Sequence, residues 1–170
     1  MDRSVAQRNG GEFDVARSGG ASSGGDAPIR PQPRLELHLP ADPRALRGMR
    51  RQVERWLVGH RVGEQALIDI QLALGEAAAN GVEHAYRKPD ADSRVDVELE
   101  FVGDGAGREL AVLVRDRGRW LQARTRPSTR GRGLAMIKAL SSGMRVTSNA
   151  YGTEVTFSVP CAPGEDRATD

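Results

Sequence analysis

The clearest pattern of apolar and polar positions in this sequence lies in residues 67–86. Glu76, Asn80 and His84 are four residues apart there, so they line one face of a helix. Alanines fill the space between this polar face and an apolar stripe, and a carboxylate and an amide beside alanines leave room for a ligand. For such a pair alone, a solvated polar face is the more common interpretation. The stripe repeats at steps of three and four residues, the spacing of an α-helix: Leu67, Ile70, Leu74, Ala78 and Gly81.

The flanking segments show either strict alternation or a second helical spacing. Residues 94–102 read RVDVELEFV, in which every second side chain is apolar, as expected for a strand with one buried face. The order β-α-α-β-β-loop-α-β-β favours an α/β (α+β) two-layer sandwich, in which a mostly antiparallel mixed sheet is covered on one face by three helices. The patterns predict strands at 35–39, 94–102, 109–115, 144–149 and 153–159, and helices at 43–59, 67–86 and 133–140.

Composition divides the chain into one domain and two tails. Residues 1–33 are rich in Gly, Ser and Arg and lack apolar periodicity, so we expect a disordered N-terminal tail. Residues 34–160 contain all the predicted elements. Residues 161–170 are polar and predict a flexible C-terminal tail, in which Cys161 is an incidental surface thiol.

Bulk properties exclude several classes of protein. One cysteine cannot form an internal disulfide and fits a reducing compartment. No apolar stretch has the length of a membrane span, and the N-terminus lacks a hydrophobic signal core. We therefore expect a cytoplasmic protein that does not bind a membrane. A net charge of +2 without a basic stripe or an aromatic platform argues against direct nucleic-acid binding.

Two side chains of the central helix could serve phosphate chemistry. Asn80 offers an amide oxygen, a hard ligand that suits Mg²⁺. Glu76, one turn earlier, could orient or deprotonate a hydroxyl nucleophile at the γ-phosphate of a nucleotide. Both assignments depend on a nucleotide site being completed by other parts of the chain.

Two glycine-containing segments could complete that site. Asp116 follows a buried strand and can accept a hydrogen bond from an exocyclic amine such as that of adenine, while Gly118 lets the backbone approach a flat ring. Gly131 and Gly133 precede or open a helix, where bare N–H groups favour phosphate. The polar, Arg-rich loop between the two segments is long enough to suggest a function.

These segments together resemble the motifs of the GHKL ATPases, the superfamily of gyrase, heat-shock chaperone and histidine-kinase ATP-binding domains. Residues 76–80 (EAAAN) resemble the N box, 116–118 (DRG) the adenine-binding G1 box, and 131–134 (GRGL) the G2 box that flanks the nucleotide lid. Trp120 departs from the pattern, because the family usually has a second glycine there. The resemblance implies a Bergerat-type fold that binds ATP and Mg²⁺, with nucleotide-binding residues Asn80 (also the Mg²⁺ ligand), Asp116, Gly118, Arg130, Gly131, Gly133, Leu134 and Thr153.

The short domain and the phrase LALGEAAANGVEHAY are most similar to the anti-sigma serine/threonine kinases of bacteria. This resemblance implies that Glu76 is the catalytic base for phosphorylation of an anti-anti-sigma protein, and that a sigma factor competes for the same kinase. Lid arginines Arg124, Arg126, Arg130 and Arg132 would then screen phosphate charge. An ATP-binding module that sequesters a partner without phosphorylating it is the main alternative. The sequence leaves the formation of a homodimer undecided. A sensor histidine kinase fragment is a weaker alternative, because no dimerisation helix with a phospho-acceptor histidine is found upstream.

Overall fold

The secondary structure follows the alternation and helical spacing of the sequence closely. The computed structural model describes residues 32–86, 89–118 and 130–161, all of which belong to the unit 31–170 that separates from residues 1–30. Within these residues the elements are β1 (Arg34–Pro40), α1 (Ala45–Gly59), α2 (Glu64–His84), β2 (Arg94–Val102), the 3₁₀ turn η1 (Gly105–Gly107), β3 (Glu109–Asp116), α3 (Arg130–Leu140), β4 (Ser142–Asn149) and β5 (Gly152–Pro160).

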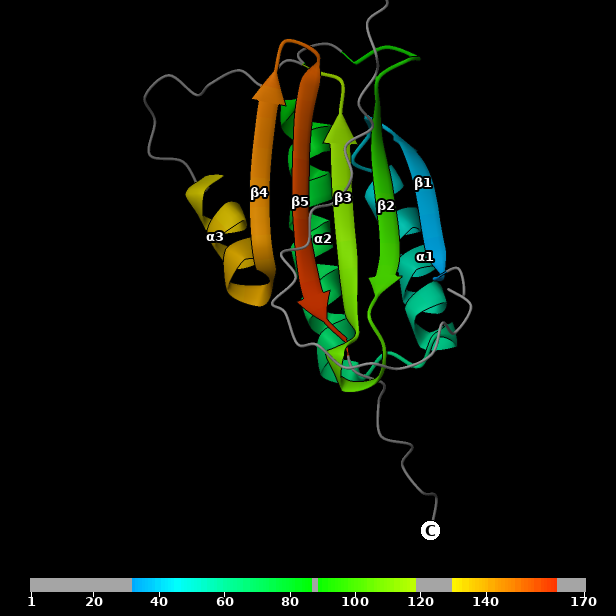
Figure 1. The fold of residues 1–170 in the computed structure, drawn as a ribbon. Coiled ribbons are helices and arrows are strands. Elements are labelled where there is room, and N and C mark those ends of the chain that lie inside the picture. Colours follow the sequence, from blue (N-terminus) through cyan, green and yellow to red (C-terminus); the bar gives the residue numbers. More distant parts are fainter. Residues whose placement is uncertain (1–31, 87–88, 119–129, 162–170) are drawn as a thin grey trace, which may run out of the picture. The chain divides into compact units, whose positions relative to one another are not determined.

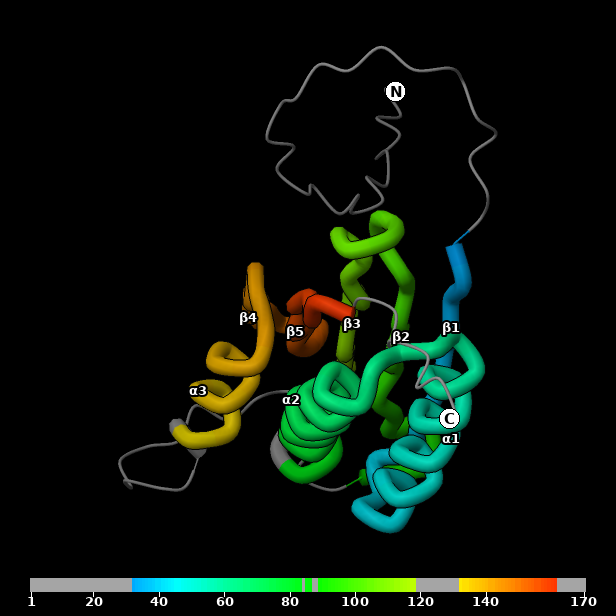
Figure 2. The backbone as a smooth tube through the Cα atoms, turned by 90° about the horizontal axis from the view of Figure 1, so that it is seen from below, coloured from blue at the N-terminus to red at the C-terminus, as the bar shows by residue number. Residues whose placement is uncertain are grey.

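The strands form one five-stranded sheet in the order β1-β2-β3-β5-β4. Each neighbouring pair in this sheet is antiparallel, and β5 lies between β3 and β4 (Figure 1). The three helices lie on one face of the sheet, which is clearest when the sheet is seen end-on (Figure 2). The predicted α+β sandwich with an antiparallel sheet and three covering helices is therefore confirmed.

The alternation of β2 explains why one face of the sheet is dry and the other wet. Four of its five apolar side chains, Val95, Val97, Leu99 and Phe101, are buried under the helices, whereas the charged side chains between them point to the other face. Two cross-strand polar contacts form on that face: an ion pair from Arg34 to Glu98 at 2.6 Å and a hydrogen bond between His38 and Asp96 at 2.7 Å. Since these pairs are largely solvent-exposed, each contributes only about 0–1 kcal/mol, and burial of the apolar face dominates.

Helix α2 is the centre of the packing. It contacts β2, β3 and β5 as well as both other helices. Ala77 and Ala78 are buried in the core, and a Cβ added to Gly81 would lie 3.1 Å from a methyl carbon of Val95. The small residues of the central helix therefore bring its backbone close to the sheet. The expectation that they leave room for a ligand is wrong for these buried positions.

Four helix boundaries differ from the predicted ones. Helix α2 covers 64–84 instead of 67–86 and α3 begins at Arg130 instead of 133, because their polar first turns carry no apolar periodicity. Helix α1 begins at Ala45 instead of 43, after a turn in which the Asp42 carboxylate accepts the N–H of Arg44 at 2.9 Å.

The segment after β5 is anchored in the core. Cys161 is fully buried, and its N–H donates to the carbonyl of Arg108 at 2.9 Å. The Arg108 guanidinium donates back to the Cys161 carbonyl at 3.1 Å and lies 4.6 Å from the ring centre of Phe101. The expectation of a surface thiol is therefore wrong, because strand β5 carries the chain directly into this cluster. The predicted tails fall outside the described residues, apart from 32–33 and 161.

Among the described helices, none is long and apolar enough to cross a lipid bilayer.

Burial makes Cys161 a specific probe of the folded state. Desolvation raises the pKa of its thiol above the ordinary value, so the reactive thiolate is rarer than in the unfolded chain. At pH 8 we expect iodoacetamide to modify the native protein at least about tenfold more slowly than the urea-unfolded protein, as followed by mass spectrometry. The chain has one cysteine, so the mass change is unambiguous. Equal rates in the two states would restore the surface assignment.

Candidate nucleotide-binding site

Glu76 and Asn80 lie on α2 at the surface that meets α3. Both are partly exposed, and α2 and α3 are in contact. A Cβ added to the buried Gly133 of α3 would stand 2.5 Å from Glu76 Oε2 and 3.8 Å from Asn80 Nδ2. The structure thus brings Gly133 next to Glu76 and Asn80, which lie more than 50 residues earlier in the sequence. Their contact depends on the absence of a side chain at position 133.

The G2-like segment is helical. Gly131 and Gly133 fall inside α3, in the first turn after Arg130, and so they do not precede the helix. Arg132 is exposed, while Leu134 packs against the hydrophobic core. Leu134 therefore anchors α3, and Gly133 makes space for the Glu76 carboxylate.

Asp116 ends β3 and is buried. Its Oδ1 accepts the N–H of Gly118 at 3.0 Å and the N–H of Thr153 at 3.2 Å. Thr153 is its register partner on β5 and is also buried, with its hydroxyl 3.3 Å from that of Ser148. The carboxylate therefore closes the turn that follows β3 and ties it to β5.

The glycines of this turn are required by neighbouring backbone. A Cβ at Gly118 would overlap the carbonyl of Ala85 at the end of α2. A Cβ at Gly152, where φ is +143°, would overlap the carbonyl of Asp116. Gly118 was expected to let a flat ring approach, whereas in the structure the space of its missing side chain is taken up by α2.

The Asp116 turn and the Glu76–Asn80 pair lie at the same end of the sheet. Val95 pairs with Asp116 in the register of β2 and β3, and Gly81, next to Asn80, contacts Val95. Figure 1 shows the end of β3 and the end of α2 on this side of the domain. A ligand that contacts Asp116 could therefore extend along α2 toward Asn80 and Glu76.

The opposite face of the sheet carries charge near this end. Arg115 pairs with Glu154 at 2.6 Å, and this hydrogen bond raises the pKa of Arg115. Arg117 lies 3.8 Å from Asp96. Both pairs are on strands or turns that flank Asp116, so they help to orient the backbone without entering the candidate site.

Sequence reasoning missed Tyr86, whose hydroxyl accepts the N–H of Arg117 at 3.0 Å. Its position just after the helical pattern was visible, but the partner lies 31 residues away. Several predicted residues fall outside the described side chains. Trp120, Arg124 and Arg126 belong to the undescribed segment 119–129, and of Arg130 and Gly131 only the helical backbone is described.

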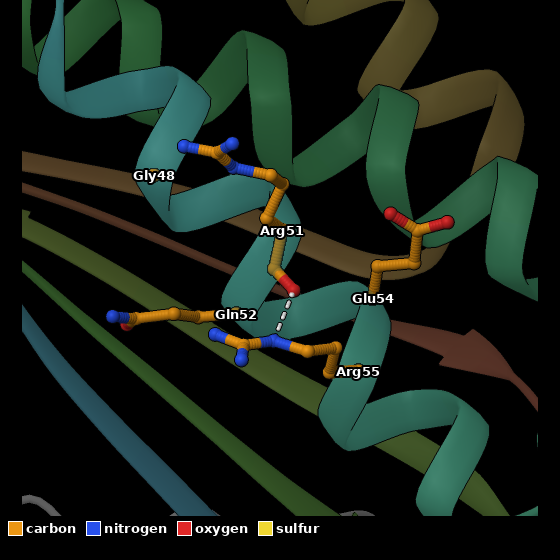
Figure 3. Close-up of a pocket in the computed structure, with 5 residues that line it drawn as sticks. All are labelled: Gly48, Arg51, Gln52, Glu54 and Arg55. Carbon is orange, nitrogen blue, oxygen red and sulfur yellow. Dashed lines mark hydrogen bonds between the residues drawn. The ribbon is translucent and has the colours of Figure 1, made fainter.

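A surface hollow of about 590 Å³ lies elsewhere, on the outer side of α1 (Figure 3). All its lining residues come from this one helix, and Arg55 Nε donates to the Arg51 carbonyl there at 3.3 Å. None of the predicted nucleotide-binding residues contributes to it. The hollow is lined by Gly48, Arg51, Gln52, Glu54 and Arg55.

Comparison with known proteins agrees with the resemblance. Residues 39–159 match the histidine kinase-like ATPase domain family. Among solved structures, the RsbU and RsbW domains of Rv1364c from Mycobacterium tuberculosis are 30% identical with a TM-score of 0.62, over 78% of this chain and 34% of that one. The histidine kinase domain of the blue-light activated histidine kinase from Erythrobacter litoralis EL346 is 22% identical with a TM-score of 0.42, over 56% of this chain and 45% of that one. This chain spans about a third of the Mycobacterium protein.

The contact between Gly133 and Glu76 can be tested by adding one methyl group. In Gly133→Ala the flexible Glu76 carboxylate must move, while α3 gains up to about 1 kcal/mol of helix propensity. We expect an unchanged or higher Tm together with ATP turnover slowed by about 10²-fold, the typical effect of a misplaced reacting group. Thermal unfolding and a coupled ADP-release assay measure the two quantities.

Gly48→Ala is the matched control, because it also replaces a helical glycine and no atom lies within 4 Å of the added Cβ. It should raise stability similarly and leave ATP turnover unchanged. Full turnover in Gly133→Ala would show that the close approach of α3 does not set the position of Glu76.

Proposed function

Because the chain belongs to the family of histidine kinase-like ATPase domains, we propose that it is an ATP-dependent protein serine/threonine kinase and a bacterial anti-sigma factor. Two observations support this branch: the N-box sequence at residues 76–80, and the similarity to a solved structure that contains an RsbW domain. The proposed substrate is an anti-anti-sigma protein and the proposed competitor is a sigma factor. A protein that regulates transcription in this way acts in the cytoplasm.

The observation that carries the proposal is the meeting of Glu76, Asn80 and Gly133 between α2 and α3. The buried Asp116 pairs with Val95, which the neighbouring Gly81 of α2 approaches. A carboxylate next to a helix start supplies a base where phosphate would lie. A buried carboxylate whose turn is closed by backbone N–H groups supplies a rigid acceptor for an adenine amine. These are the two recognition elements that ATP needs.

The proposed reaction is transfer of the γ-phosphoryl group to a Ser or Thr hydroxyl. The hydroxyl oxygen attacks the γ-phosphorus, the bond from that phosphorus to the β–γ bridging oxygen breaks, and ADP leaves with the bond's electron pair. Glu76 accepts the hydroxyl proton as the new phosphate ester forms. Lid arginines, of which Arg132 is described and exposed, would balance the phosphate charge.

The residues present fit a Mg²⁺ ion bound together with the nucleotide. Asn80 offers a hard oxygen ligand for the ion, and the Glu76 carboxylate, one turn earlier on α2, stays available as the base. Across the described residues, no three His, Cys, Asp or Glu side chains gather into a metal site of their own. A Mg²⁺ ion at Asn80 would take its remaining ligands from phosphates and water. When bound, Mg²⁺ neutralises charge on the phosphate oxygens.

Transfer can be separated from binding with Glu76→Gln, which keeps the size of the side chain and removes the base. The variant should bind ATP as wild type does, whereas transfer should slow by roughly 10²–10⁴-fold. The quantity to measure is the ³²P incorporated from [γ-³²P]ATP into the proteins of a native cell extract, with wild type and variant compared in parallel. Phosphoamino-acid analysis should find acid-stable phosphoserine or phosphothreonine in the wild-type sample.

Three other results would each overturn part of the proposal. Acid-labile phosphohistidine would indicate a histidine kinase. Label that does not depend on Glu76 would remove its role as base. A wild-type protein that binds ATP and retains a sigma factor without any transfer would be a sequestering module.

Asp116→Asn tests the adenine contact. The amide oxygen can still accept the N–H groups of Gly118 and Thr153, so the turn should persist. The loss of a charged acceptor for the adenine amine should weaken ATP binding by about 1.5–3 kcal/mol, measured by calorimetry. Wild-type affinity in this variant would exclude Asp116 from adenine recognition.

A further inference from the structure

The hydroxyl group of Tyr86 lies where three segments of the chain meet. It donates to the carbonyl of Arg94 at 2.6 Å and accepts the N–H of Arg94 at 3.3 Å and the N–H of Arg117 at 3.0 Å. A tyrosine hydroxyl has one donor and two acceptor positions, so these bonds use its full capacity. The end of α2, the start of β2 and the turn after β3 are therefore joined at one oxygen atom.

The residue before Tyr86 contacts the same turn. Ala85 is buried, and its carbonyl occupies the space in which Gly118 would carry a Cβ. The N–H of Ala85 donates to the carbonyl of Gly81 at 3.3 Å, which continues the hydrogen bonding of α2 by one residue. Ala85 and Tyr86, which directly follow α2, therefore both contact the turn formed by residues 116–118.

The Tyr86 bond begins where the sheet pairing stops. Asp116 is the last residue of β3 and pairs with Val95 and Thr153, so Arg117 is the first residue beyond the ladder. Its N–H is held by Tyr86, and the next N–H, that of Gly118, is held by Asp116 itself. Removing the tyrosine hydroxyl would release the turn on the side of α2 and keep it closed by Asp116.

We propose that Tyr86 is a positioning residue for nucleotide binding, which fixes the Asp116–Gly118 turn on the helix that carries Glu76 and Asn80. The proposal rests on the proposed function, in which Asp116 contacts adenine and Glu76 faces the γ-phosphate. One rigid helix then fixes the positions of the residues that contact the adenine and of those that face the γ-phosphate. Glu76 and Asn80 lie in the body of α2, and Ala85 and Tyr86 directly follow it. Because these two residues contact the Asp116–Gly118 turn, α2 connects the γ-phosphate site to the adenine site.

The test is Tyr86→Phe, which deletes one oxygen atom and keeps the ring. Because the turn contacts adenine and not phosphate, affinity for ATP and for ADP should fall by the same factor, about five- to tenfold. With Mg·ATP at saturation, transfer to the Ser or Thr hydroxyl of the protein substrate should stay within about twofold of wild type, so KM for ATP rises and kcat does not. Calorimetry with ATP and ADP and steady-state kinetics measure these quantities on the full chain.

The matched control is Tyr151→Phe, the same deletion at the other tyrosine of the chain, which is 85% exposed. It should leave both affinities unchanged. A purely structural role for Tyr86 would lower Tm and kcat without an adenine-specific loss of affinity, and that result would overturn the proposal. Equal nucleotide affinities in Tyr86→Phe and wild type would also overturn it.

A double-mutant cycle shows whether Tyr86 acts through Asp116. In the Asp116→Asn background the adenine contact is already lost, so Tyr86→Phe should cost less than about twofold in affinity. Additive losses would contradict the mechanism. If the wild-type protein binds neither ATP nor ADP, the proposed function fails; if it binds them and the cycle is additive, only the role of Tyr86 fails.

Gly118→Ala reaches the same turn by a different route, because its added Cβ overlaps the Ala85 carbonyl. It should reproduce the equal loss for ATP and ADP. A normal affinity in this folded variant would show that the contact between α2 and the turn does not control nucleotide binding.

Discussion

The close approach of α2 to the sheet is the constraint on which the rest of this domain depends. Gly81 lies against the methyl groups of Val95, and the alanines before it are buried under the strands. Larger side chains there would push the helix outward. Since Val95 pairs with Asp116, the approach of α2 to the sheet also affects how far Asp116 lies from Asn80 and Glu76. Core packing and ligand geometry are therefore set by the same small residues.

The glycines of the site leave space for different kinds of neighbouring atoms, and this decides which of them can be replaced. Gly133 leaves space for the Glu76 side chain, which is flexible. Gly118 and Gly152 leave space for main-chain carbonyl groups, which cannot move without shifting α2 or β3. A methyl group is thus tolerated in folding terms at the first position and far less at the other two.

Much of the fold could be predicted because the relevant signals are local. The ends of strand β2 agree with the predicted ones, since period-two alternation runs from Arg94 to Phe101. The Glu76–Asn80 ridge was visible from its spacing of four. The first turns of α2 and α3 could not be predicted, because they contain few apolar residues. Burial of Cys161 and the bonds of Tyr86 could not be predicted either, because their partners, Arg108 and Arg117, lie 53 and 31 residues away.

The aromatic cluster at the other end of the domain has a consequence for spectroscopy. Trp56 stacks on Phe101 with ring centres 4.9 Å apart, and His60 lies against both rings. Phe101 pairs with Leu110, six residues along β3 from Asp116, which corresponds to about 20 Å of extended strand. Emission from Trp56 therefore reports whether α1 remains docked on the sheet, at a distance from bound nucleotide. Because the chain has two tryptophans, replacing Trp56 by Phe would leave the emission of Trp120 as a signal free of this background.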